Sequence, residues 1–167
     1  MNHVLRTERL LLEPVTALDL TALVAHWTQP DVRRFLFDGT VLSTDEIRTV
    51  ITESRRDFTA SGYGFWIIRE GNGGGALAGT VGLRQLEELG PEIVYSLAPG
   101  VWGKGYATEA AGAVVEYALG TLGVPQVLAE VDNGNPASAA VIQRLGLTPF
   151  DEVPGLLGPM TRYRRTR

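Results

Sequence analysis

The sequence contains no cysteine and only two histidines, His3 and His26. Without cysteine the chain cannot form a disulfide, use a thiol as nucleophile or bind a metal through thiolates. Two histidines are too few for a zinc centre built from histidine ligands. We therefore expect no metal cofactor, and we interpret His26 as an ordinary helix residue.

Long apolar runs and an excess of basic residues are also missing. No run approaches the roughly 18 residues of a membrane-spanning helix, and charged residues interrupt every N-terminal window that could form a signal-peptide core. The net charge is −4, whereas binding nucleic acid without regard to sequence requires a basic face. These absences predict a cytoplasmic protein without membrane or nucleic-acid partners, and the acidic balance suits a positively charged substrate.

The composition that remains is that of a folded globular protein. Hydrophobic residues make up 44% and charged residues 20% of the 167 positions, which are ordinary values. A chain of this length is sufficient for one domain with a sizeable core, but not for two independent ones. We therefore expect a single domain over residues 1–167.

Turn residues and hydrophobic periodicity divide the chain into strand and helix segments. Apolar and β-branched runs predict strands at 9–15, 65–70, 76–86, 92–99 and 127–132, with two more near the C-terminus. Helices are predicted in two pieces within 16–37 broken at Pro30, after Ser43 and Glu46, from about 106 to 122, and after Asn135 and Pro136. The three central strands form an antiparallel meander, so the fold class is mixed α+β rather than doubly wound.

One stretch, VWGKGYATEAA at 101–111, places glycines directly ahead of a helical pattern. Gly103 and Gly105 permit tight curvature, and Ala107 keeps the start of the helix uncrowded. The N–H groups from Gly103 to Thr108 would converge on an anion at the positive end of the helix, which suits a diphosphate. The plain alternative for an isolated pair of glycines is a simple turn between strand and helix.

Two other phosphate-binding loops fail on spacing. The Walker pattern needs lysine and then serine or threonine after its last glycine, but Gly105 is followed by Tyr106 and Ala107. The dinucleotide fingerprint needs glycine where Thr108 stands, and an early βαβ unit. A different kind of diphosphate cradle is therefore expected.

Several motifs together resemble the GNAT superfamily of acetyl-CoA-dependent N-acetyltransferases, in its RimJ/RimL-like branch. The similarity covers nearly the whole chain and is carried by TERLLLEPV (7–15), QPDVRRFLF (29–37), EIVYSLAPGVWGKGYATEAA (92–111) and VDNGNPASAAVIQRLGL (131–147). In the superfamily's pyrophosphate pattern, Gly105 and Ala107 match, while Trp102 stands where the wider superfamily has glutamine or arginine. Tryptophan is usual there in this branch.

The resemblance implies a GNAT fold. Its sheet is mostly antiparallel, has about seven strands splayed between strands 4 and 5, and carries about four helices on its faces. The co-substrate implied is acetyl-CoA, and the main-chain N–H of Leu97 or Ala98 is the implied oxyanion donor. The residues that the resemblance assigns to acetyl-CoA are Leu97, Ala98, Pro99, Trp102, Gly103, Lys104, Gly105, Tyr106, Ala107, Thr108, Asn135 and Ser138.

Amide formation from an amine and a thioester needs a proton acceptor for the amine. The candidates are Glu92, which matches the glutamate of the branch's E-I-x-Y pattern, and Glu87 or Glu88 on the preceding turn. Burial would raise the pKa of such a carboxyl group toward neutrality. We favour Glu92, with a purely structural role and deprotonation through water as the open alternatives.

The leaving thiolate must be protonated or solvated. Many superfamily members place a tyrosine four residues before the closing glycine of the last motif, but this chain has Ile142 there. Ser138 resembles the serine that the branch offers in its place, and a role confined to the first turn of the helix is the alternative. Asn135 is expected both to cap that helix and to bond the pantetheine amides.

The sequence therefore predicts an N-acetyltransferase that joins acetyl-CoA and a primary amine in a ternary complex. The acceptor stays open between a protein N-terminus, an aminoglycoside, a polyamine and an amino acid, and the branch resemblance favours an α-amino group. Tyr63, Trp66 and Tyr95 could line an amine pocket, although strand aromatics are more often core. The alternatives are a non-catalytic acyl-CoA-binding module and, more distantly, a nucleotide-binding domain. A homodimer is left open.

Overall fold

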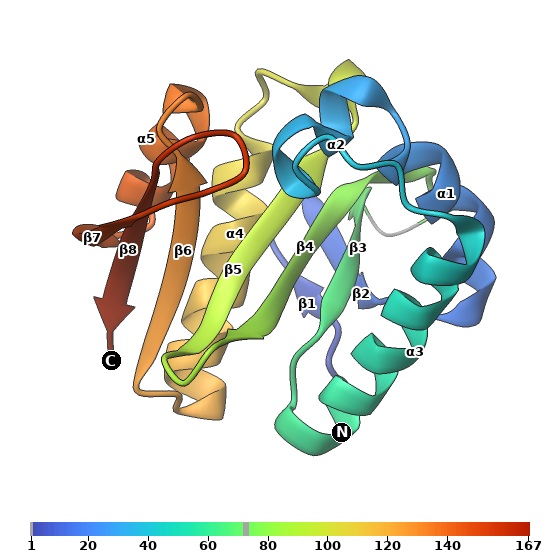
Figure 1. Ribbon diagram of the computed structural model, residues 1–167. Helices are drawn as coiled ribbons and strands as arrows, with labels where there is room; N and C mark the ends of the chain where they lie inside the picture. The colour runs from blue at the N-terminus through green and yellow to red at the C-terminus, as the bar shows by residue number, and fades with distance from the viewer. Residues whose placement is uncertain (1, 72–73) are drawn as a thin grey trace.

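One twisted sheet runs through the molecule in this computed structural model, which describes residues 2–71 and 74–167 (Figure 1). Within those residues the sheet has eight strands in the order β1-β2-β3-β4-β5-β6-β8-β7. Their bounds are β1 Leu5–Arg6, β2 Leu10–Pro14, β3 Phe65–Glu70, β4 Leu77–Leu86, β5 Gly90–Leu97, β6 Gln126–Asp132, β7 Thr148–Val153 and β8 Met160–Thr166. The expected mixed α+β fold with a mostly antiparallel sheet is confirmed.

Three helices from the first third of the chain cover one face of the sheet. They are α1 (Leu20–Trp27), preceded by the 3-10 turn η1 (Ala17–Asp19), then α2 (Pro30–Leu36) and α3 (Thr44–Ser61). Pro30 separates α1 from α2 because proline suits the first turn of a helix but not its interior. The capping box predicted for α3 is present: Glu46 N–H donates to Ser43 Oγ (3.1 Å) and Ser43 N–H to Glu46 Oε1 (3.0 Å).

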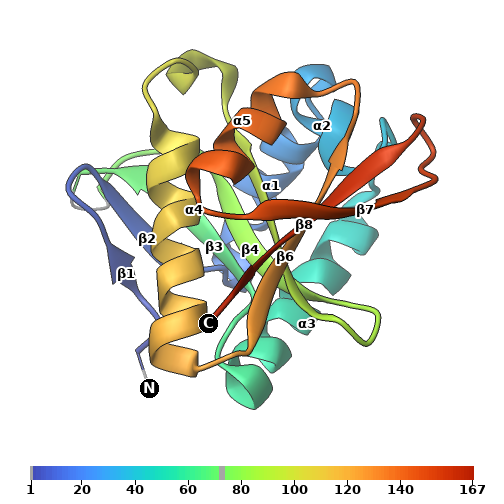
Figure 2. The ribbon, with the colours of Figure 1, turned by 90° about the vertical axis from the view of Figure 1, so that its left-hand side faces the viewer.

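The opposite face carries the remaining helices (Figure 2). They are the 3-10 turn η2 (Pro99–Val101), α4 (Tyr106–Glu116) with its π-helical continuation η3 (Tyr117–Leu122), and α5 (Pro136–Arg144). Small and β-branched residues let α4 lie close to the sheet: Ala110, Ala111, Val114 and Val115 are all fully buried. Gly123 ends η3 in the left-handed conformation (φ 71°).

The sheet opens between β5 and β6. Strands β3, β4 and β5 form the predicted antiparallel meander, and β6 pairs with β8 along its whole length. By contrast β5 and β6 are parallel, and among the described residues they share a single registered pair, Glu92 with Leu128. Beyond that pair the strands diverge, which confirms the expected splay between the fourth and fifth predicted strands.

One detail of the fold differs from the sequence-based expectation. The sheet has an additional edge strand, β1, in which Leu5 and Arg6 pair with Leu12 and Leu11. Two residues are too few to show strand alternation, so the sequence carried no signal for it.

Across residues 2–71 and 74–167, no helix combines the length and apolar character that crossing a bilayer would require.

Candidate active site

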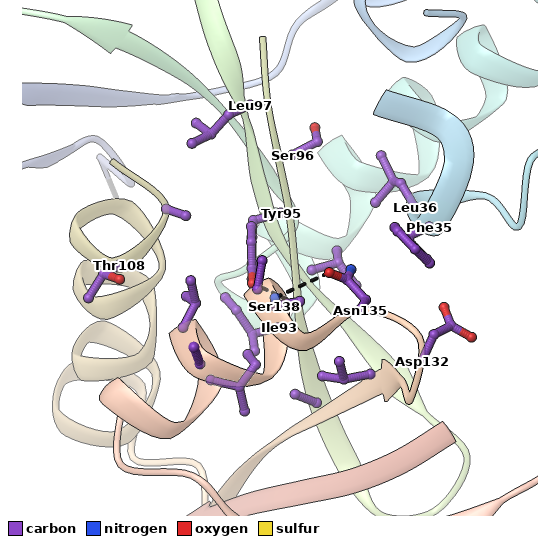
Figure 3. A pocket seen from close by; sticks show the side chains of 18 of the residues that line it. Phe35, Leu36, Ile93, Tyr95, Ser96, Leu97, Thr108, Asp132, Asn135 and Ser138 are labelled. Carbon is purple, nitrogen blue, oxygen red and sulfur yellow. Dashed lines mark hydrogen bonds between the residues drawn. The ribbon is translucent and has the colours of Figure 1, made fainter. Parts of the chain in front are cut away.

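A cavity of about 860 Å³ lies where β5 and β6 separate (Figure 3). Its walls come from α2, the C-terminal halves of β5 and β6, the loop ahead of α4, the first turn of α4, and α5. The divergence of the two strands leaves their facing main chains without ladder partners, which is the arrangement needed to receive an extended ligand.

The cavity has two sides because strand residues alternate between the faces of a sheet. Three alternate residues of β5 belong to the core beneath α4: Ile93, Tyr95 and Leu97. The residues between them face the other way, and β6 is in register with β5. Four ionisable or hydroxyl side chains of the two strands therefore share the face below α2: Glu92, Ser96, Glu130 and Asp132. We refer to these as the α4 side and the α2 side.

On the α4 side, the glycine loop has the predicted curvature. Gly103 and Gly105 both have φ of +81°, and Gly105 is the N-terminal cap of α4. No side chain of the described chain caps this helix, so its first N–H groups stay free for a ligand. The predicted residues that line the cavity here are Trp102, Gly103, Gly105, Tyr106, Ala107 and Thr108.

Lys104 is placed differently from the other loop residues. Its ammonium group lies 3.7 Å from Glu70 Oε2, outside the cavity lining within the described chain. Its carbonyl oxygen accepts a hydrogen bond from Arg9 Nη1 (2.8 Å). Lys104 therefore holds the loop against the sheet, and the structure does not bring its side chain to the predicted acetyl-CoA site.

A second anchor of the loop was missed by sequence reasoning. Arg9 donates from Nε to Glu109 Oε1 (2.6 Å) and from its N–H to Glu109 Oε2 (2.9 Å), and Thr7 also bonds this carboxylate. Burial alone would raise the pKa of Glu109, but these hydrogen bonds and the charge of Arg9 lower it. Glu109 therefore does more than favour the start of a helix, because it ties α4 to the turn between β1 and β2.

The end of β5 distinguishes between the two predicted oxyanion donors. Ala98 N–H already donates to the Ala78 carbonyl oxygen (2.8 Å). Hydrogen bonding alternates along an antiparallel ladder, so Leu97, opposite Gly79, directs its N–H away from β4 and toward the gap beside β6. Trp102 Nε1–H donates to the Leu97 carbonyl oxygen (2.9 Å). Leu97 lines the cavity, whereas Ala98 and Pro99 are outside the lining found for the described chain.

The α4 side also contains a pair of hydroxyl groups. Ser138 Oγ lies 2.7 Å from the Tyr95 hydroxyl, and Ser138 N–H donates to Asn135 Oδ1 (3.2 Å), which is the predicted helix cap (Figure 3). Burial raises the pKa of Tyr95, although the bond to Ser138 acts in the opposite direction. Ile142 is buried and lines the same cavity. The position that lacks the superfamily's tyrosine, on α5, therefore lines the same cavity as Tyr95 of β5.

On the α2 side, Glu92 is one of three carboxylates considered as a base, and only this one reaches the cavity among the described residues. Its side chain is 4% exposed and accepts a hydrogen bond from Arg84 Nε (2.7 Å). Burial raises the pKa of Glu92, and the positive charge of Arg84 opposes that shift. Glu87 and Glu88 are exposed on the turn before β5, where Glu87 pairs with Arg162 (3.1 Å).

His26 is on a helix, as interpreted, but it is not an ordinary helix residue. It is buried, and its Nε2 lies 2.8 Å from Ser96 Oγ, which lies 2.8 Å from Thr80 Oγ1. Burial lowers the pKa of His26 to about 4, so the ring is neutral at pH 7. Because 70 positions separate His26 from Ser96, no local pattern could have connected them.

The other predicted aromatic residues divide between the core and the surface. Trp66 is fully buried in the core. Tyr63 lies near Gln85, 3.4 Å from hydroxyl to Oε1, outside the cavity lining in the described residues. Of the three aromatics proposed for an amine pocket, Tyr95 is the one that lines this cavity.

Asp132, at the end of β6, was missed as well. Its side chain is 7% exposed, and its Oδ1 has no hydrogen-bond partner among the described residues. Burial raises the pKa of Asp132, and the negative charges of Asp38 and Glu130 raise it further. Asp38 is part of the loop that follows α2 and also lines the cavity.

Comparison with known proteins gives relatives at several levels of similarity. The chain is 31% identical over 153 residues to the FsC-acetyl coenzyme A-N(2)-transacetylase of Aspergillus fumigatus, an alignment covering 83% of this chain and 65% of that protein. An acetyltransferase structure from Agrobacterium tumefaciens is 28% identical and has a TM-score of 0.84, covering 98% of this chain and 94% of the other.

A more distant structure is RimL, the ribosomal L7/L12 alpha-N-protein acetyltransferase in complex with coenzyme A. It has a TM-score of 0.82 at 18% identity and covers 98% of this chain and 97% of its own, a likeness that shows the fold alone. The sequence profile described as "Acetyltransferase (GNAT) domain" matches residues 9–148. The protein therefore belongs to the GNAT acetyltransferase family, whose enzymes use acetyl-CoA.

Proposed function

We propose that the protein is an N-acetyltransferase that moves the acetyl group of acetyl-CoA directly to a primary amine while both are bound. The acceptor is a small-molecule amine or a protein N-terminus. The observation that carries this proposal is the cavity at the splay, which has an uncapped helix N-terminus on one side and a buried carboxylate, Glu92, on the other. A ternary complex needs these two kinds of site to meet in one cavity.

Acetyl-CoA would occupy the α4 side. The N–H groups of Gly103 to Thr108 would hold the diphosphate at the positive end of α4, where main-chain curvature rather than a lysine charge makes the contact. The pantetheine arm would run along the unpaired edge of β5, with Asn135 bonding its amides. We assign the oxyanion contact to the Leu97 N–H because the Ala98 N–H is already used by Ala78.

Deprotonation of the amine is assigned to Glu92, directly or through a water. A base acts best when its pKa is near the working pH, and the burial of Glu92 shifts its pKa in that direction. The positive charge of Arg84 opposes the shift and favours the ionised form that a base needs. Glu92 lies at the closed end of the splay, so a water between carboxylate and amine fits this position best.

Departure of the thiolate is assigned to Ser138 together with Tyr95. Ser138 is in the first turn of α5, at the positive end of the helix, which favours negative charge although the Ser138 N–H itself is bonded to Asn135 Oδ1. The bond between the two hydroxyl groups lets Tyr95 supply a proton to Ser138 as Ser138 donates to sulfur. The non-catalytic alternative was based on Ile142 in place of tyrosine, and this pair offers another source of the same proton.

The test is release of free coenzyme A thiol from acetyl-CoA in the presence of primary amines, including amino acids, short peptides, diamines and aminosugars. The protein has no cysteine, so it contributes no background thiol. Amine-dependent thiol release with intersecting initial-rate lines would support direct transfer. An acetylated protein formed from acetyl-CoA alone would contradict direct transfer. If none of the amine classes caused release of the thiol, the proposal would be rejected. A cytoplasmic location and the absence of a metal cofactor remain predictions, and a homodimer remains open.

A further inference from the structure

The α2 side of the cavity has four ionisable or hydroxyl side chains from two strands. Glu92 and Ser96 come from β5, and Glu130 and Asp132 come from β6, all on the face below α2. Ser96 and Asp132 each lie four residues beyond the registered pair of Glu92 and Leu128. They are therefore at the same level of the two parallel strands, on opposite sides of the gap between β5 and β6. The acceptor amine must enter on this side if acetyl-CoA occupies the other.

Most of the negative charge on this side is already neutralised. Arg84 Nε lies 2.7 Å from Glu92 Oε1. Arg162 lies 2.8 Å from Glu130 Oε2 through Nε and 3.1 Å from Glu87 Oε1 through Nη2. Each of these carboxylates therefore has a cation that offsets the cost of its desolvation.

Asp132 is the exception. It is as buried as a core residue, at 7% exposure, yet its Oδ1 has no partner in the part of the chain that is described. The charges that act on it are Asp38 and Glu130, both negative. A buried carboxylate oxygen without a partner is costly, and such an atom calls for a partner that a ligand can supply.

The surroundings of Asp132 favour a cationic ligand. Asp38 is exposed on the loop after α2, with its negative charge toward the same end of the cavity. Phe35 and Leu36 of α2 lie on that side and offer apolar surface for a methylene chain (Figure 3). Arg34 also lines the cavity but is exposed, and its guanidinium stacks over the Phe35 ring at 4.9 Å. A second positive charge on the acceptor would therefore meet the carboxylates of Asp132 and Asp38, and the carbon chain that carries it would pack on Phe35 and Leu36.

We propose that Asp132, assisted by Asp38, binds a second cationic group of the acceptor, so that the substrate is an amine with another ammonium or guanidinium group on the same molecule. This inference rests on the acetyl transfer proposed above. Glu92 acts on the reacting amine and the Leu97 N–H on the acetyl oxygen, while Asp132 holds the distal cation across the splay. Asp132 is a specificity residue and takes no part in the chemical step.

The test compares 1,4-diaminobutane with 1-aminobutane, which share a carbon chain and differ in the distal charge. For the wild-type protein we expect kcat/KM for the diamine to exceed that for the monoamine by about tenfold or more, the size of one charge-assisted hydrogen bond. Asp132→Asn should remove this preference mainly through KM, with the monoamine unchanged. Asp38→Asn should cause a smaller loss because Asp38 is exposed. Glu53→Gln, on the outer surface of α3, removes one charge far from the cavity and is the matched control.

A binding measurement separates this proposal from the proposed reaction. Calorimetric titration of the two amines into protein saturated with coenzyme A reports recognition without turnover. Tighter binding of the diamine that is lost in Asp132→Asn would support the inference even if no amine were acetylated. Equal binding of both amines, or an equal effect of Asp132→Asn on both, would overturn it while leaving acetyl transfer intact. Asp132→Asn should also raise Tm, because it relieves a buried charge, so a folding defect would count against the proposal.

Discussion

The two sides of the cavity are built in different ways. The α4 side is made from the residues of β5 that face α4, the loop and first turn of α4, and the start of α5, and the contacts proposed for it are mainly with main-chain groups. The α2 side is made from side chains that come from separate segments: the α2 region, the meander and the end of β6. Main-chain contacts depend on the fold and suit a ligand that all members of a family bind. Side-chain contacts can change by substitution without altering the fold.

This difference separates binding of the donor from choice of the acceptor. Substitutions on the α4 side should affect acetyl-CoA binding or thiolate departure to the same extent with every amine. Substitutions at Asp132 or Asp38 should affect one amine more than another. The clearest tests are substitutions whose effects would contradict this separation of donor binding from acceptor choice. The largest effect, on acetyl-CoA affinity, is expected at the glycine loop.

Gly105→Val should weaken acetyl-CoA binding by about a hundredfold or more, measured by calorimetry. The residue has φ of +81°, which β-branched side chains avoid, and it caps α4 where phosphate oxygens would approach. Lys104→Ala is the matched control, because its side chain pairs with Glu70 outside the cavity. We expect a change of about threefold or less for the control, which is the size of a surface ion pair. Unchanged affinity in folded Gly105→Val would reject the loop as the diphosphate site.

The α4 side was also the part that sequence could predict well. Gly103 and Gly105, the cap at Asn135 and the position of Ser138 are local features, because each depends on residues within one turn of each other. Their positions follow from turn and helix chemistry, and the family resemblance supplied the ligand. The side-chain partner of Lys104 could not be predicted in this way, because Glu70 is in β3, far from the loop in sequence.

The α2 side could not be predicted for the same physical reason. Ser96 and His26 are neighbours only because α1 packs on the meander, and Asp132 meets Asp38 only through the position of α2. Asp132 was visible in sequence as the last residue of a strand, where an acidic residue is unremarkable. Its significance lies in what it lacks, a hydrogen-bond partner within the described residues, and a missing partner leaves no sequence pattern.

Ser138→Ala should lower kcat by up to about a hundredfold with little change in acetyl-CoA affinity. A hydrogen-bond donor that acts only in the transition state contributes up to about 3 kcal/mol. Tyr95→Phe should have a smaller effect alone and none in a Ser138→Ala background, because its proton passes through Ser138. Additive losses in the double variant would show that the two hydroxyl groups act separately. A wild-type rate for Ser138→Ala would leave thiolate departure to the helix N–H groups and solvent.

Buried His26, which contacts Ser96 on the α2 side, should make the free energy of unfolding depend on pH. Its pKa is lowered to about 4 in the folded protein, from about 6.5 when unfolded, so protons bind preferentially to the unfolded chain between these values. Stability from neutral His26 is complete above pH 6.5 and is lost as the pH falls toward 4. Between pH 7.5 and pH 5 the loss should be about 2 kcal/mol. Denaturant unfolding of wild type and His26→Gln across this range checks it, and parallel curves would contradict the prediction.

Glu92→Gln should give the smallest effect, about a tenfold lower rate near pH 7, because water can partly replace a base. Burial raises the pKa of Glu92, so in the wild type the carboxylate is available only above that raised pKa and the rate falls on the acidic side. The difference in rate between variant and wild type should narrow as the pH approaches the pKa of the amine, where free amine is abundant.

Arg84→Met removes the cation that lowers the pKa of Glu92, so the acidic limb of the pH–rate profile should move to higher pH. If pH–rate profiles of wild type and Glu92→Gln overlay, Glu92 is structural and water is the base. If the limb stays in place in Arg84→Met, some group other than Glu92 sets it.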